Sequence, residues 1–121
     1  MNSVVPNDVT VDAVSMVPYL ADSTEVSSRD VLYSEAFNGS RANSITGVTV
    51  RDEQYHLIRY EDGEELLFDL VNDATEKTNL LAGSLSDAEE SAYCSLYSEL
   101  IALLSTEPGT VVPVLPQLCS P

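Results

Sequence analysis

The sequence predicts a small α+β domain, a roughly four-stranded antiparallel sheet with one C-terminal amphipathic helix. Four β-rich segments follow one another with short turns between them, which is typical of an antiparallel meander. A later segment repeats apolar residues at three- and four-residue spacing, as a helix with one buried face does. We expect residues 30–105 to form the folded unit, preceded by an irregular lead-in at 1–29 and followed by a Pro-rich extended tail at 106–121.

The lead-in is rich in Ser, Asp, Val and Pro, and its only sustained apolar run covers residues 11–20. Pro18 prevents a long regular element within this run. We expect a loop or a short helical turn laid on the core, followed by a polar connector at 22–28.

The predicted strands have β-rich composition and are separated by turn signals; they cover residues 31–37, 45–51, 54–60 and 65–70. The first ends at Asn38-Gly39, a strong turn signal. Asp62-Gly63 lies between the third and fourth strands, where it predicts a tight hairpin because Gly tolerates a positive φ.

The helix is predicted over residues 87–104. Ser86 and Glu89 fit a capping box, in which each side chain satisfies a free backbone N–H of the other residue. The expected buried stripe consists of Tyr93, Leu96, Tyr97, Leu100, Leu103 and Leu104. Pro108-Gly109 ends the helix, and the tail beyond it either packs on the sheet or frays.

The charge balance limits the kinds of partner. The chain of 121 residues has 20 Asp and Glu against 5 Lys and Arg, a formal net charge of −15, while its hydrophobic content of 44 % is ordinary for a globular protein. Binding to nucleic acid or to an anionic membrane requires clustered basic residues, so both partners are disfavoured. The acidic excess favours solubility.

The cysteines and the first residues say little about compartment. Cys94 and Cys119 form neither a disulfide framework nor a zinc motif, which leaves their redox state open. The start lacks the features of a signal peptide, and no apolar stretch approaches the roughly 20 residues of a membrane span. We therefore expect no export signal or membrane anchor in the chain as written.

His56 is the only histidine, and on a strand it shares a face with Ile58 and Tyr60. A G-x-S-x-G motif is absent, so no nucleophile is marked beside it. We expect His56 to have a structural or surface role.

Acidic residues gather around Gly63, but their spacing does not fit an EF-hand, because ligand positions would fall on apolar or aromatic residues. A solvated hairpin tip is the expected role of Glu61, Asp62, Glu64 and Glu65. Asp69, Asp73 and Glu76 could bind a cation, yet acids in such a loop more often bond its own backbone. The sequence thus predicts no catalytic, cofactor-binding or metal residue.

Residues 51–81 resemble the C-terminal signature of the sulfatase family. In that family a Tyr-Lys-Leu-Ile strand leads to Glu-Leu-Tyr-Asp-Leu, then Asn-Asp-Pro, a Glu and Thr-Asn-Leu. The positions that match it here include Tyr55, Leu57, Ile58, Asp69, Leu70, Asn72, Asp73, Glu76, Asn79 and Leu80. Residues 11–20 also resemble the family's Asp-Gly-Val-Ser-Leu-Leu-Pro-Leu-Leu segment. His56 stands where Lys is usual, Phe68 replaces Tyr, and 74–75 replace Pro-Gly, which makes the loop less rigid.

The resemblance implies a small C-terminal subdomain, with the helix packed on the sheet, attached to a larger alkaline-phosphatase-like domain. Sulfatases hydrolyse sulfate esters or N-sulfates with a formylglycine, made in a C/S-x-P-x-R motif, and a divalent cation, usually calcium. We expect that apparatus to lie in a missing N-terminal catalytic domain, the implied partner. This chain alone would be inert, supporting that domain and edging its substrate pocket.

The implied parent would be periplasmic, extracellular or lysosomal; the compartment of this chain stays unknown. The alternative is a free-standing acidic interaction module with no enzymatic role, whose sheet face or acidic loops bind a partner.

Overall fold

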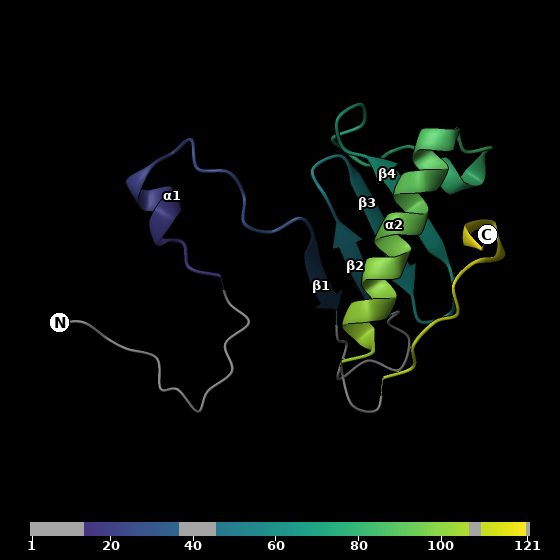
Figure 1. Cartoon of the computed structure of the whole chain (residues 1–121). Helices are drawn as coiled ribbons and strands as arrows, with labels where there is room; N and C mark the ends of the chain where they lie inside the picture. The colour runs from purple at the N-terminus through teal and green to yellow at the C-terminus, as the bar shows by residue number, and fades with distance from the viewer. Residues whose placement is uncertain (1–13, 37–45, 107–109, 121) are drawn as a thin grey trace.

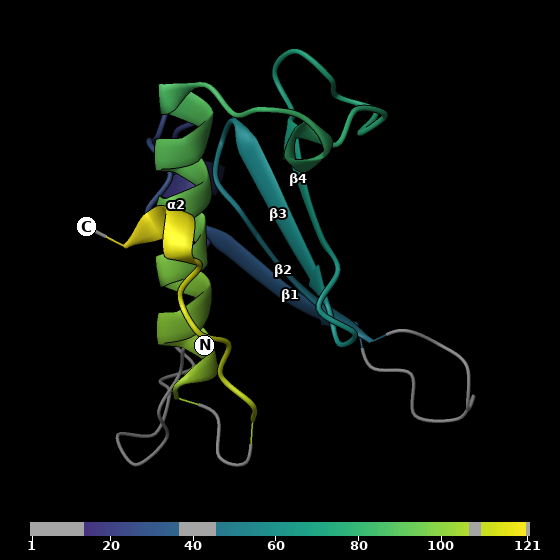
Figure 2. The same cartoon turned by 90° about the vertical axis from the view of Figure 1, so that its right-hand side faces the viewer.

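The computed structural model describes residues 14–36, 46–106 and 110–120 and has the predicted α+β fold. Its sheet is antiparallel with strand order β1-β2-β3-β4. Helix α2 (Asp87–Leu104) packs along one face of it (Figures 1 and 2). The strands, in order, are β1 (Leu32–Ala36), β2 (Gly47–Arg51), β3 (Tyr55–Tyr60) and β4 (Glu65–Asp69).

Each strand lies within the range expected for it, and α2 has the predicted bounds. Ser86 and Glu89 form the capping box, in which Ser86 N donates to Glu89 Oε2 over 2.7 Å. In the β3–β4 hairpin, Gly63 has a φ of 92°, and its N–H donates to Tyr60 O over 3.0 Å. The expected turn at Asn38-Gly39 falls outside the described residues.

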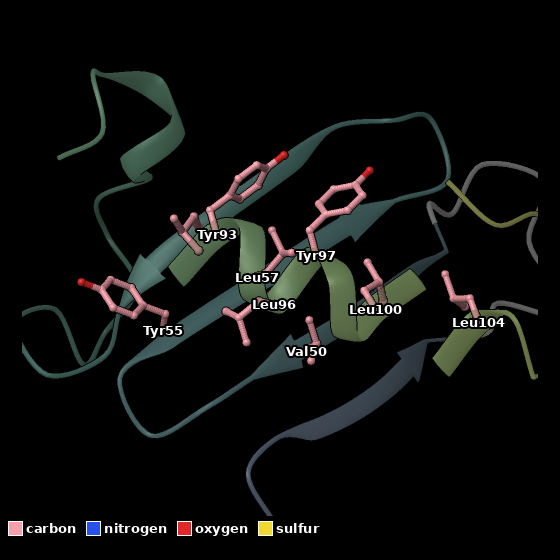
Figure 3. Packing of buried hydrophobic residues seen from close by; sticks show 9 residues of the cluster. Val50, Tyr55, Leu57, Tyr93, Leu96, Tyr97, Leu100 and Leu104 are labelled. Carbon is pink, nitrogen blue, oxygen red and sulfur yellow. The ribbon is translucent and has the colours of Figure 1, made fainter. Parts of the chain in front are cut away.

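The core lies between the sheet and α2 (Figure 3). Register places Val50 opposite Leu57, and Leu57 opposite Leu67, so one row of apolar side chains crosses three strands. All three are completely buried. Facing them, α2 contributes the buried residues Tyr93, Leu96, Tyr97, Leu100 and Leu104. Truncating a leucine in such a core to Ala costs about 2–5 kcal/mol.

The tail folds back along α2 and is covalently attached to it. A disulfide joins Cys94 of α2 to Cys119 of the 3₁₀ turn η2 (Gln117–Cys119), with Cα atoms 5.3 Å apart. Leu115 also packs against the core. The sequence left the redox state of both cysteines open and offered two fates for the tail, fraying or packing on the sheet. The described part of the tail instead packs on the helix, because the disulfide holds it there.

The lead-in contains the short helical turn α1 (Val17–Ala21), with Pro18 in its first turn. The expectation that this run is laid on the core is wrong for the residues described. Its apolar side chains face solvent, and Leu20 is 86 % exposed. Figure 1 shows α1 standing away from the sheet, beyond β1. A helix of only five residues is too short to present a continuous apolar stripe to the sheet.

Candidate functional site

The residues that match the sulfatase signature lie on β3, β4 and the loop that follows. Tyr55 and Leu57 point to the helix side of the sheet, whereas Ile58 points to the opposite face. The remaining matches belong to the end of β4, to the loop at 70–79 and to the 3₁₀ turn η1 (Leu80–Ala82). The loop and the end of β4 therefore form the candidate site.

Asp69 closes the start of the loop. Its Oδ1 accepts from the backbone N–H groups of Val71 and Asn72 at 3.0 and 3.1 Å, and its Oδ2 accepts from Asn72 Nδ2 at 2.8 Å. These hydrogen bonds, with that of the Asn72 side chain the largest cause, lower the pKa of the Asp69 carboxyl below its ordinary value. The carboxylate is thus engaged by its own loop.

Asp73 organises the second half of the loop in the same way. Its Oδ2 accepts from the backbone N–H groups of Thr78 and Lys77, each at 2.7 Å. The bond from Thr78 is the main cause that lowers the pKa of the Asp73 carboxyl. An ionised Asp73 therefore fixes the path of the chain from 73 to 78.

Asn79 connects the loop to the sheet. Its Oδ1 accepts from Leu67 N at 3.0 Å and from Leu81 N at 3.1 Å. The first bond satisfies a backbone donor on the outer edge of β4, and the second caps η1. An unpaired edge strand invites pairing with other chains, so Asn79 also protects this edge.

His56 meets Glu76 on the face of the sheet opposite α2. Its Nδ1 lies 2.6 Å from Glu76 Oε1, and its side chain is 14 % exposed. Glu76 has a φ of 54°, the left-handed region that non-glycine residues seldom adopt. The pair therefore ties the strained point of the loop to β3, which agrees with the structural role expected for His56.

Glu65 departs from the expected solvated hairpin tip. Glu61, Asp62 and Glu64 are exposed as predicted, but Glu65 is the first residue of β4, and strand alternation turns it to the helix side. There it accepts from Tyr93 Oη at 2.5 Å and Tyr97 Oη at 3.0 Å.

Arg59 completes this cluster, with its Nε 3.3 Å from Glu65 Oε1. Burial, followed by the bond to Glu65, raises the pKa of Tyr93. Sequence reasoning missed the cluster, although one signal was available. Two tyrosines on a buried helical stripe need polar partners for their hydroxyl groups.

The side-chain oxygens of Asp69, Asp73 and Asn79 in this site already accept hydrogen bonds from backbone N–H groups of the chain. Within the described residues, no group of three or more His, Cys, Asp or Glu is arranged to hold a metal ion. No helix in that same part is long and apolar enough to cross a membrane. The arrangement is that of a structural loop.

Two solved structures resemble this fold. One is a protein from Bacteroides thetaiotaomicron VPI-5482 assigned as a sulfatase; the match has a TM-score of 0.65 and 21 % identity, and covers 97 % of this chain and 25 % of that one. The other is BT4656, solved with its substrate D-glucosamine-2-N,6-O-disulfate; the match has a TM-score of 0.58 and 22 % identity, and covers 84 % of this chain and 20 % of that one.

This chain thus spans a quarter or less of the length of these two proteins. No protein-family model matches it. No curated protein matches it either. At these identities the likeness shows the fold, which is shared with a small part of sulfatase-like proteins.

Proposed function

We propose that this chain is the C-terminal part of a sulfatase-like hydrolase whose complete form hydrolyses sulfate esters or N-sulfates. The observation that carries the proposal is the agreement of two independent likenesses. The signature residues on β3, β4 and the loop resemble the sulfatase C-terminus, and the fold matches a fraction of two sulfatase-like structures.

In this proposal the chain supports catalysis without performing it. Its loop acids are occupied by backbone donors, as with Asp73, and the described residues contain no candidate metal cluster. The calcium ion and the formylglycine would belong to a separate catalytic domain, the partner that we infer. The loop that Asp69, Asp73 and Asn79 hold would present a fixed edge to that domain.

The coding DNA upstream of Met1 tests the proposal. We expect an in-frame C/S-x-P-x-R motif followed by Asp-rich metal ligands, and arylsulfatase turnover by the polypeptide that contains both parts. The purified 121-residue chain should show no turnover. An independent promoter and start site directly before Met1, with no such motif upstream, would favour the free-standing acidic module instead.

A further inference from the structure

The two faces of the sheet differ in what covers them. Helix α2 packs on one face, whereas on the other the described residues include only the loop at 70–79, which reaches His56 through Glu76 (Figure 2). We call the second face the open face; its strand residues, assigned from register and alternation, are Leu32, Ser34, Ala36, Gly47, Thr49, Arg51, His56, Ile58, Tyr60, Leu66 and Phe68.

The open face carries no acidic side chain among these strand residues, although the whole chain has 20 Asp and Glu. The acids of the same strands, Glu35, Glu65 and Asp69, all point to the helix side. Acidic side chains on an exposed face favour solubility. A face of this acidic chain whose strands carry none therefore indicates an interaction surface.

The centre of the open face is apolar. Ile58 and Leu66 are cross-strand partners, and Tyr60 follows Ile58 on the same face. The Tyr60 ring packs closely over Gly47: a Cβ atom at that position would lie only 3.1 Å from Tyr60 Cδ1. These side chains are only partly buried, and Leu32 at the edge is 45 % exposed.

The ends of the open face are polar. At one end Arg51 is exposed and paired in register with His56. Glu76 of the loop meets His56 there. Phe68 of this face is buried, whereas the rest of the apolar centre is only partly covered and is bordered by the cation of Arg51. A partly exposed apolar centre with a charged border is the usual composition of an interface core and its rim.

We infer that the open face docks onto the catalytic domain of the sulfatase-like protein, with Arg51 facing a carboxylate of that domain. The inference rests on the proposed function and adds the surface through which the two parts meet. The two matched structures contain three-quarters or more of chain beyond the part that this protein resembles, so such a neighbour is available. A second copy is a poorer occupant, because two chains of net charge −15 repel each other.

The experiment uses the upstream-encoded polypeptide, expressed separately, and measures its association with this chain by calorimetry. Thr49→Glu places a carboxylate at the centre of the open face without removing an apolar side chain. Ile58→Glu places one within the apolar pair of Ile58 and Leu66. Ser95→Glu is the matched control, because it adds the same charge at an exposed position of α2. Circular dichroism checks that each variant keeps the fold.

We expect Thr49→Glu and Ile58→Glu to weaken association by at least about tenfold, and Ser95→Glu to leave it within about twofold. If both open-face variants bind like the wild type, the docking inference is wrong while the proposed function stands. If no catalytic domain is encoded upstream, both proposals fail together. A dimer of this chain that Thr49→Glu dissociates would assign the face to a second copy and overturn the inference.

Discussion

The disulfide between Cys94 and Cys119 allows a quantitative test of how the tail is held. The bond joins residues 25 apart in sequence. In the chain-entropy description, closing a loop of this length stabilises the folded state by about 3.5 kcal/mol relative to the reduced chain. For a chain of 121 residues this corresponds to a decrease in Tm of roughly 10–15 °C when the bond is removed.

The assay compares thermal melts of the wild type and of the Cys94→Ala/Cys119→Ala variant, each with and without a reductant. Reduction should lower the wild-type Tm to a value near that of the variant and should leave the variant unchanged. The far-UV spectrum should persist below Tm, because the core between α2 and the sheet does not depend on the tail alone. Two free thiols in the folded wild type, or a Tm indifferent to reductant, would refute the reasoning.

Three further predictions concern the polar contacts. Tyr93→Phe removes a donor to the half-buried Glu65 carboxylate and should lower the free energy of unfolding by about 1.5–3 kcal/mol in denaturant titrations; a loss below about 0.5 kcal/mol would contradict this contact. Asp73→Asn should destabilise the chain at neutral pH. Since the folded pKa of Asp73 lies below the ordinary 3.8, its contribution is present above that pH and is lost as pH falls through the folded pKa, so melts of variant and wild type should converge in acid. Asn79→Ala should cost about 1–2 kcal/mol by leaving Leu67 N–H unpaired, whereas Asn79→Asp keeps an acceptor and should recover most of that loss; equal losses in the two variants would exclude the hydrogen bond as the cause.

Local chemistry explains why much of the fold could be predicted. The helix bounds follow from the capping pair Ser86 and Glu89 and from the apolar stripe, both of which are properties of a short stretch of sequence. The β3–β4 hairpin follows from Gly63, the one described glycine with a positive φ. Where a few neighbouring residues decide a structure, reading them in order is sufficient.

Long-range pairing could not be predicted in the same way. Cys94 and Cys119 form a bond only because the tail reverses beside α2, and no spacing rule marks that reversal. Glu65 belongs by sequence to an acidic turn, but its position in β4 turns it toward Tyr93 and Tyr97. The absence of acids from the strand residues of the open face likewise became visible only when the register of all the strands was known.

The loop illustrates what resemblance adds and what geometry adds. The family signature singles out Asp69, Asp73 and Asn79, but it does not say what their side chains do. In the structure each of the three side chains accepts a hydrogen bond from a backbone N–H group. A short side chain with an oxygen acceptor is therefore needed at each position. In this chain the pattern of these three residues therefore has a structural explanation in the loop itself.

The central claim is that this chain functions as the C-terminal part of a larger sulfatase-like protein. The most direct test is the mass of the native polypeptide that contains the α2 sequence, isolated from its source and mapped by mass spectrometry. The matched structures predict a polypeptide roughly four times the length of this chain, carrying sulfatase-like peptides before residue 1. A native polypeptide of 13.1 kDa that begins at Met1 would contradict the claim.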